Sequence, residues 1–91
     1  MKIKNWDIPD VLFNDYVKFR TLADSYLDGK SETPSNTDYE RRARWLLCVG
    51  KVMETHRKIC KALNIEYSED TDDEFYKEFH RAVDKQVELK G

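Results

Sequence analysis

The first third of the chain carries apolar residues at steps of three and four, which is the period of an amphipathic helix. These residues are Leu12, Tyr16, Phe19, Ala23 and Tyr26. Pro9 stands where a first helical turn tolerates proline, and Asp28-Gly29 supplies a turn with a glycine suited to a left-handed C-terminal cap. We therefore expect a helix over about 8–27, with this apolar face against the core.

A second, longer helix is predicted after the stretch 30–36, whose polar composition and lack of a hydrophobic period indicate a loop. Thr37 and Glu40 have the spacing of a capping box, in which each side chain accepts a backbone amide hydrogen of the first turn. The following residues contain no proline and one glycine, Gly50. We expect a helix over about 38–63.

A third helix is predicted from a second capping box, formed by Thr71 and Glu74. Acidic residues in its first turn suit the positive end of the helix dipole. One face of the following segment is apolar and includes Phe75 and Phe79. The predicted helix covers about 72–89.

No segment of useful length alternates polar and apolar residues, so no sheet is expected. The first six residues can form a short extended segment, which Ile3 and Trp6 would hold against the helices. We predict a small all-α three-helix bundle with a short extended N-terminus, in a single domain over residues 1–91.

The composition is that of an ordinary globular domain, with 37% charged and 40% hydrophobic residues. A formal net charge of -2 gives no overall attraction to nucleic acid or to an anionic membrane. The longest apolar run, from Trp45 to Val49, is far shorter than the roughly 20 residues of a membrane-spanning helix. We therefore expect no membrane association.

The chain has two cysteines, Cys48 and Cys60, and both fall in the predicted central helix. At about 1.5 Å of rise per residue they lie roughly 18 Å apart. A disulfide needs Cα atoms within about 7 Å, so these two cysteines cannot pair within the chain. Two free thiols favour a reducing compartment, and we expect a cytoplasmic protein.

Charge is uneven along the chain. Residues 31–63 hold seven basic and four acidic side chains, whereas residues 64–91 hold four basic and nine acidic ones. The structural interpretation is that the basic central helix packs beside the acidic third helix, with Glu74 and Glu78 as partners. The functional interpretation is that the basic side chains form a binding surface.

A helical projection supports a basic stripe, which comprises Arg44, Lys51 and Lys58 on the side opposite the apolar face. Arg41 lies at its edge, and Arg42 adds a fifth cation nearby. We expect these five residues to bind a protein partner with an acidic surface. The alternative is binding of nucleic acid or of a nucleotide phosphate, through the same residues.

Zinc and catalysis are the chemical hypotheses raised by Cys48, His56, Cys60 and His80. No Cys-x-x-Cys pair or other zinc-ligand spacing is present, and His56 falls in the middle of the apolar face. We therefore expect His56 to be a buried structural residue with a lowered pKa. The sequence contains no catalytic motif, so the prediction is a protein without enzymatic activity, cofactor or metal.

Three apolar residues, Phe13, Val17 and Leu47, fall outside the predicted core faces. Exposed apolar residues of this kind can form a partner or dimer surface. A short, acidic chain rich in Tyr and Trp is typical of small regulators and inhibitors of phages or mobile elements. The sequence thus predicts a protein-interaction module, with homo-oligomerisation as a further option.

Overall fold

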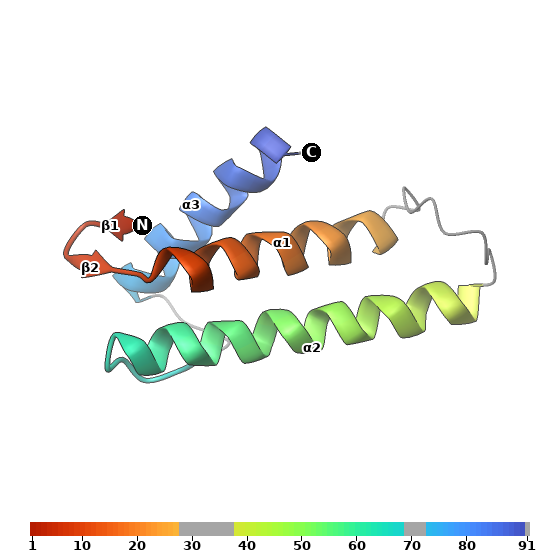
Figure 1. Ribbon diagram of the computed structural model, residues 1–91, viewed down its shortest axis with the longest axis horizontal. Helices are drawn as coiled ribbons and strands as arrows, with labels where there is room; N and C mark the ends of the chain where they lie inside the picture. Colours follow the sequence, from red (N-terminus) through yellow and green to blue (C-terminus); the bar gives the residue numbers. More distant parts are fainter. Residues whose placement is uncertain (28–37, 69–72, 91) are drawn as a thin grey trace.

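The computed structural model describes residues 1–27, 38–68 and 73–90, which form three helices and a small N-terminal sheet (Figure 1). Helix α1 spans Asp10–Leu27, α2 spans Asp38–Ala62 and α3 spans Glu74–Lys90. The predicted all-α three-helix bundle is confirmed, and each observed helix boundary lies within two residues of the expected one.

Helices α1 and α2 run side by side in opposite directions along the long axis of the molecule (Figure 1). Helix α3 lies along α1 from Phe13, which contacts Phe79, to Arg20, which pairs with Asp84 at 2.6 Å. Its last turns point away from the α1–α2 pair (Figure 1). The three helices therefore share a core at only one end of the α1–α2 pair.

The core at this end is built largely from aromatic rings. The ring of Phe79, fully buried, stacks on Phe75 at 5.6 Å and meets the edge of Tyr16 at 5.0 Å. Burial of a side chain of this size stabilises a fold by about 1.5–3 kcal/mol. The remaining members of the buried cluster are Ile3, Ile8, Phe13, Val17, Ile59, Cys60, Tyr76 and Val83.

Phe13 and Val17 correct the prediction that both would lie outside the core. They are only 4% and 1% exposed. Helix α1 is covered by two neighbours: Tyr16 of the predicted face meets His56 of α2, while Phe13 contacts Phe79 of α3. The buried surface of α1 is therefore wider than a single apolar stripe.

The N-terminus forms a minimal antiparallel hairpin of strands β1 (Lys2–Ile3) and β2 (Trp6–Asp7), with Ile3 opposite Trp6. The expectation of no sheet was wrong in this respect, because strands of two residues are too short to show an alternating pattern. Ile3 is buried, and Trp6 meets the edge of Phe75 at 5.2 Å. The predicted anchoring of the extended N-terminus by these two residues is confirmed.

The described helix ends have identifiable caps. Asn64 adopts a φ of 58°, and the amide of Ile65 donates to the carbonyl of Cys60 at 2.8 Å, which is the Schellman arrangement at the end of α2. Helix α3 begins after Asp73, whose carboxylate accepts a hydrogen bond from the Phe75 amide at 3.3 Å. The predicted caps at 28–29, Thr37 and Thr71 lie outside the described residues.

Candidate functional site

Helix α2 is buried only in its second half. Its buried residues are Thr55, His56, Ile59 and Cys60. Every residue from Glu40 to Glu54 is half-buried or exposed. The first half of α2 therefore extends beyond the core and offers its surface to solvent.

This exposed half carries an outer apolar patch, which comprises Ala43, Leu46, Leu47 and Gly50. The four residues are spaced at i, i+3, i+4 and i+7, so they share one face of the helix, opposite the buried face. Leu46 is 54% exposed and Leu47 is 73% exposed. The expected exposure of Leu47 is confirmed, and it belongs to a larger surface than the sequence indicated.

Two cations of the predicted basic stripe lie on one flank of this patch. Lys51 and Lys58 are exposed, and their Nζ atoms lie 3.8 and 3.5 Å from the carboxylate of Glu54. Both pairs are formed within α2. Exposed pairs one helical turn apart contribute only a few tenths of a kcal/mol, so they leave most of this positive potential available.

The three predicted arginines differ in exposure and in the side of α2 on which they lie. Arg42 is exposed, whereas Arg41 and Arg44 are half-buried, and none of the three forms an ion pair with a described residue. At about 100° per residue, Arg42 lies on the opposite flank of the outer apolar patch from Lys51. Arg44 continues the line of Lys51 and Lys58 on the other flank, whereas Arg41 lies on the buried side of α2. Four of the five predicted residues therefore flank the patch, and Arg41 does not.

The acidic residues of α3 have other partners, which contradicts the structural interpretation of the charge pattern. Glu74 pairs with Lys4 of the hairpin turn. Glu78 lies 3.9 Å from Lys4 and 3.1 Å from Arg81 of its own helix. Among the described residues, no ion pair joins α2 to α3. The basic residues of α2 are therefore not neutralised by α3.

Sequence reasoning missed Leu46, Gly50 and Arg57 as surface residues of interest. Arg57 is exposed and lies in line with Gly50 two turns further along α2, with its guanidinium 5.1 Å from the ring centre of Tyr67. The available signal was the i, i+3, i+4, i+7 spacing of apolar residues on the far side of the helix from the core. The apolar pattern of the buried face is stronger, so this second pattern on the outer face was overlooked.

A buried polar cluster lies where α2 meets α3 and α1. His56 is 6% exposed, as predicted, and its ring meets Tyr16 at 5.6 Å and His80 at 5.6 Å. Burial lowers the pKa of His56 to about 4, and the neighbouring His80 acts in the same direction. Burial also lowers the pKa of His80, while Asp84 opposes this shift. Within the described residues, no group of three or more potential metal ligands comes together.

Cys60 is the nearest thiol to this cluster, and it is 1% exposed. Its Sγ lies 3.4 Å from the hydroxyl of Tyr76, which also donates to the Glu66 carbonyl and accepts from the Ser68 amide. Burial raises the pKa of the Cys60 thiol. A buried thiol with a raised pKa is a poor nucleophile, and its observed contacts tie α2 and the segment after it to α3.

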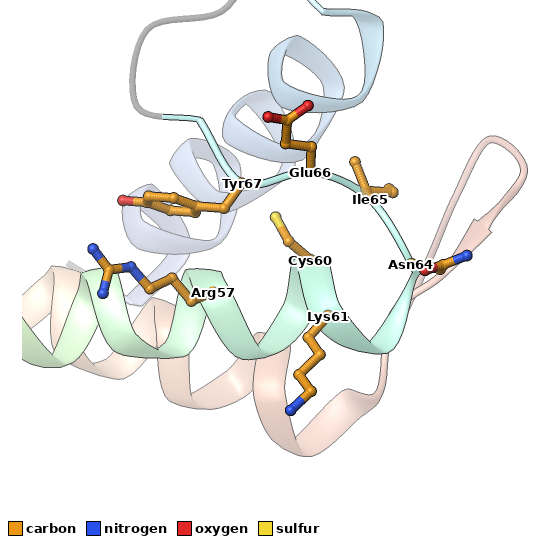
Figure 2. A pocket seen from close by; sticks show the side chains of 7 residues that line it. All are labelled: Arg57, Cys60, Lys61, Asn64, Ile65, Glu66 and Tyr67. Atoms are coloured by element: carbon orange, nitrogen blue, oxygen red, sulfur yellow. The ribbon is translucent and has the colours of Figure 1, made fainter.

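A cavity of about 420 Å³ opens at the end of α2, between the helix and the segment that follows it (Figure 2). Its lining comprises Arg57, Cys60, Lys61, Asn64, Ile65, Glu66 and Tyr67. The charged ends of Lys61 and Glu66 point away from each other and away from the cavity (Figure 2). Ligand sites usually have polar groups that converge on one point, so we do not assign a ligand to this cavity.

Comparison of the chain with protein-family models, with curated proteins and with solved structures found no match. Within the described part of the chain, none of the helices has the length and apolar character required to cross a membrane.

Proposed function

We propose that this chain is a non-enzymatic protein-binding module, a small regulator or inhibitor that binds an acidic surface of a partner protein through the exposed face of α2. The observation that carries the proposal is the combination of two exposed leucines, Leu46 and Leu47, with cations on both sides. Between residues 40 and 58 the chain has six basic and two acidic side chains. Such a surface offers apolar contact area together with electrostatic attraction.

A protein partner is favoured over nucleic acid because apolar residues lie between the cations of α2. A phosphate backbone is bound by a groove or row of cations and hydrogen-bond donors. Here Leu46, Leu47 and Gly50 occupy the middle of the basic surface, where a phosphate would gain no hydrogen bond. Exposed leucines instead gain free energy when another apolar surface covers them.

The proposed setting is the cytoplasm. Cys48 and Cys60 are free thiols, both on α2, and free thiols suit a reducing compartment. The partner expected there is a protein with an acidic surface.

Affinity capture from cells that encode the chain tests the proposal, with the wild type compared with the double variant Lys51→Glu, Lys58→Glu. Each substitution replaces an attractive charge by a repulsive one, so capture of a specific protein should fall by about tenfold or more. The matched control is Lys77→Glu, Lys85→Glu, which makes the same charge change at exposed positions of α3.

The control variant should capture the partner as the wild type does. Equal loss of capture in both variants, or no loss in either, would contradict a binding face on α2. Recovery of nucleic acid in place of a protein, with a steep loss of binding as salt rises, would support the nucleic-acid alternative.

A further inference from the structure

Gly50 stands in the middle of α2, on its solvent side, at the end of the outer apolar patch. Glycine inside a helix is less stable than alanine, because its backbone loses more conformational freedom on folding. A Cβ atom built at Gly50 would have no heavy atom within 4 Å apart from its chain neighbours and the nearby backbone of its own helix. Packing within this chain therefore gives no reason for glycine at this position.

The surroundings of Gly50 match a site where a second helix can approach closely. Small residues let helix axes come together, while larger neighbours one turn away supply the contact area. Ala43 and Gly50 are the small residues of the patch, and Leu46 and Leu47 are the large ones. In Figure 1, α2 forms one edge of the molecule, and along residues 43–50 no described helix lies on its side away from α1.

The charges around the patch define the chemistry of the occupant. Arg42 lies on one flank, Lys51 and Lys58 lie on the other, and Arg57 lies in line with Gly50 two turns further along α2, as the helical angle of about 100° per residue requires. All four side chains are exposed. A helix lying over the patch would therefore have cations on both sides and Arg57 beyond the end of the patch.

From this geometry we infer that the outer apolar patch binds an acidic amphipathic helix of the partner protein. Its apolar seam lies over Gly50 and between Leu46 and Leu47, and carboxylates beside that seam face Arg42 on one flank and Lys51 and Lys58 on the other. The inference rests on the proposed protein-binding function and adds the occupant and its orientation. This mode of recognition, an amphipathic helix read through i, i+3, i+4 and i+7 anchors, is common among peptide-binding domains.

A second copy of this chain fits the patch less well. Two α2 helices packed face to face would place Arg42, Lys51, Arg57 and Lys58 of one copy against the same cations of the other. Like charges across an interface are unfavourable and act against the wrong partner. The acids on this side of the described part of α2 are Glu40 and Glu54, fewer than the four cations, and Glu54 already lies between Lys51 and Lys58.

Selection from a displayed peptide library tests the inference and does not require the partner protein. The probe is a library of helical peptides with a fixed leucine and alanine seam, in which the flanking positions vary among Glu, Lys, Gln and Ser. Selection on the full-length protein should enrich glutamate at the flanks. An enriched peptide should bind about tenfold more weakly to Gly50→Leu, whose side chain fills the point of close approach.

Gly50→Ala gives a second readout, because it should bind the enriched peptide more weakly than the wild type while its thermal midpoint rises. A merely structural role of Gly50 would not separate these two effects. The Lys77→Glu, Lys85→Glu control should bind the peptide as the wild type does.

Failure to enrich any peptide, enrichment of lysine at the flanks, or equal binding by Gly50→Leu would overturn the inference. A dimer in sedimentation equilibrium that Leu47→Glu dissociates would also overturn it, in favour of self-association. If no peptide binds but the Lys51→Glu, Lys58→Glu variant still loses the captured protein, the protein-binding function stands and the helical occupant fails. If the substitutions on α2 affect neither peptide binding nor capture of the partner protein, the helical occupant and the protein-binding function both fail.

Discussion

The imidazole rings of His56 and His80 meet edge to face between α2 and α3, with their centres 5.6 Å apart and their planes at 83°. His56 is buried, and its Nε2 atom has no hydrogen-bond partner among the described residues. Two imidazoles this close and this buried are both favoured in the neutral form. The contact between α2 and α3 at these rings is therefore favoured when both histidines are uncharged.

This arrangement predicts that the protein loses stability in mild acid. The pKa of His56 is lowered to about 4 in the folded protein, whereas an unfolded histidine has a pKa of about 6.5. Between these values the unfolded chain binds more protons, so the free energy of unfolding decreases as pH falls from about 6.5 towards 4. The loss should be on the order of 1–3 kcal/mol, and urea unfolding measured across this pH range would detect it.

His56→Phe provides the control for this pH dependence, because it keeps an aromatic ring beside Phe79 and removes the titrating group. The variant should show a clearly shallower fall in stability between pH 6.5 and 4 than the wild type. An unchanged slope would show that other groups, such as the carboxylates of α3, govern the acid response.

Asp73 is predicted to stabilise the start of α3, because its carboxylate accepts the amide hydrogen of Phe75. Asp73→Ala should lower the free energy of unfolding by about 0.5–2 kcal/mol, the usual effect of losing an N-cap. Asp73→Asn is the matched control, since asparagine caps a helix about as well as aspartate. Equal stability of the alanine and asparagine variants would exclude this capping role.

Gly50→Ala is predicted to stabilise the isolated protein. The new methyl group meets no atom beyond its chain neighbours and the nearby backbone of its own helix, and alanine loses less backbone freedom in a helix than glycine does. The free energy of unfolding should rise by about 0.5–1 kcal/mol. A decrease in denaturant unfolding would mean that Gly50 is needed by this chain itself, which would remove the argument for a partner at this position.

The triple variant Arg44→Glu, Lys51→Glu, Lys58→Glu is predicted to fold nearly as well as the wild type. Its side chains make no observed ion pair outside α2, and exposed pairs contribute about 0–1 kcal/mol each. Some destabilisation, about 1 kcal/mol, is expected because the new acids lie near Glu54. A loss of several kcal/mol in thermal or denaturant unfolding would show that these cations support the fold.

The helices could be predicted from sequence because each has a local signal, whereas the arrangement of neighbours could not. The pattern of Leu12, Tyr16 and Phe19 identifies one buried face of α1. Burial of Phe13 depends on where α3 lies, and no local period contains that information. Helix periodicity identifies the strongest apolar stripe of a helix. It does not show whether a second neighbouring element covers another side of the same helix.

The charge pattern of the sequence likewise does not show which charged residues meet in the fold. The sequence shows a basic helix and an acidic helix, and complementarity between them is a reasonable expectation. In the fold, Lys4 of the hairpin turn reaches Glu74, and Arg20 of α1 reaches Asp84. Which charges meet depends on tertiary placement, so the isolation of the basic face of α2 became visible only in the structure.

The solvent face of α2 is the proposed binding site for a partner. Amide NMR spectra of the protein, recorded alone and with the captured partner, would locate the binding site residue by residue. The largest signal changes are expected on residues 42–58, with Leu46, Leu47 and Gly50 among them. Changes confined to α3 or to the N-terminal hairpin, with residues 42–58 unaffected, would contradict this proposal.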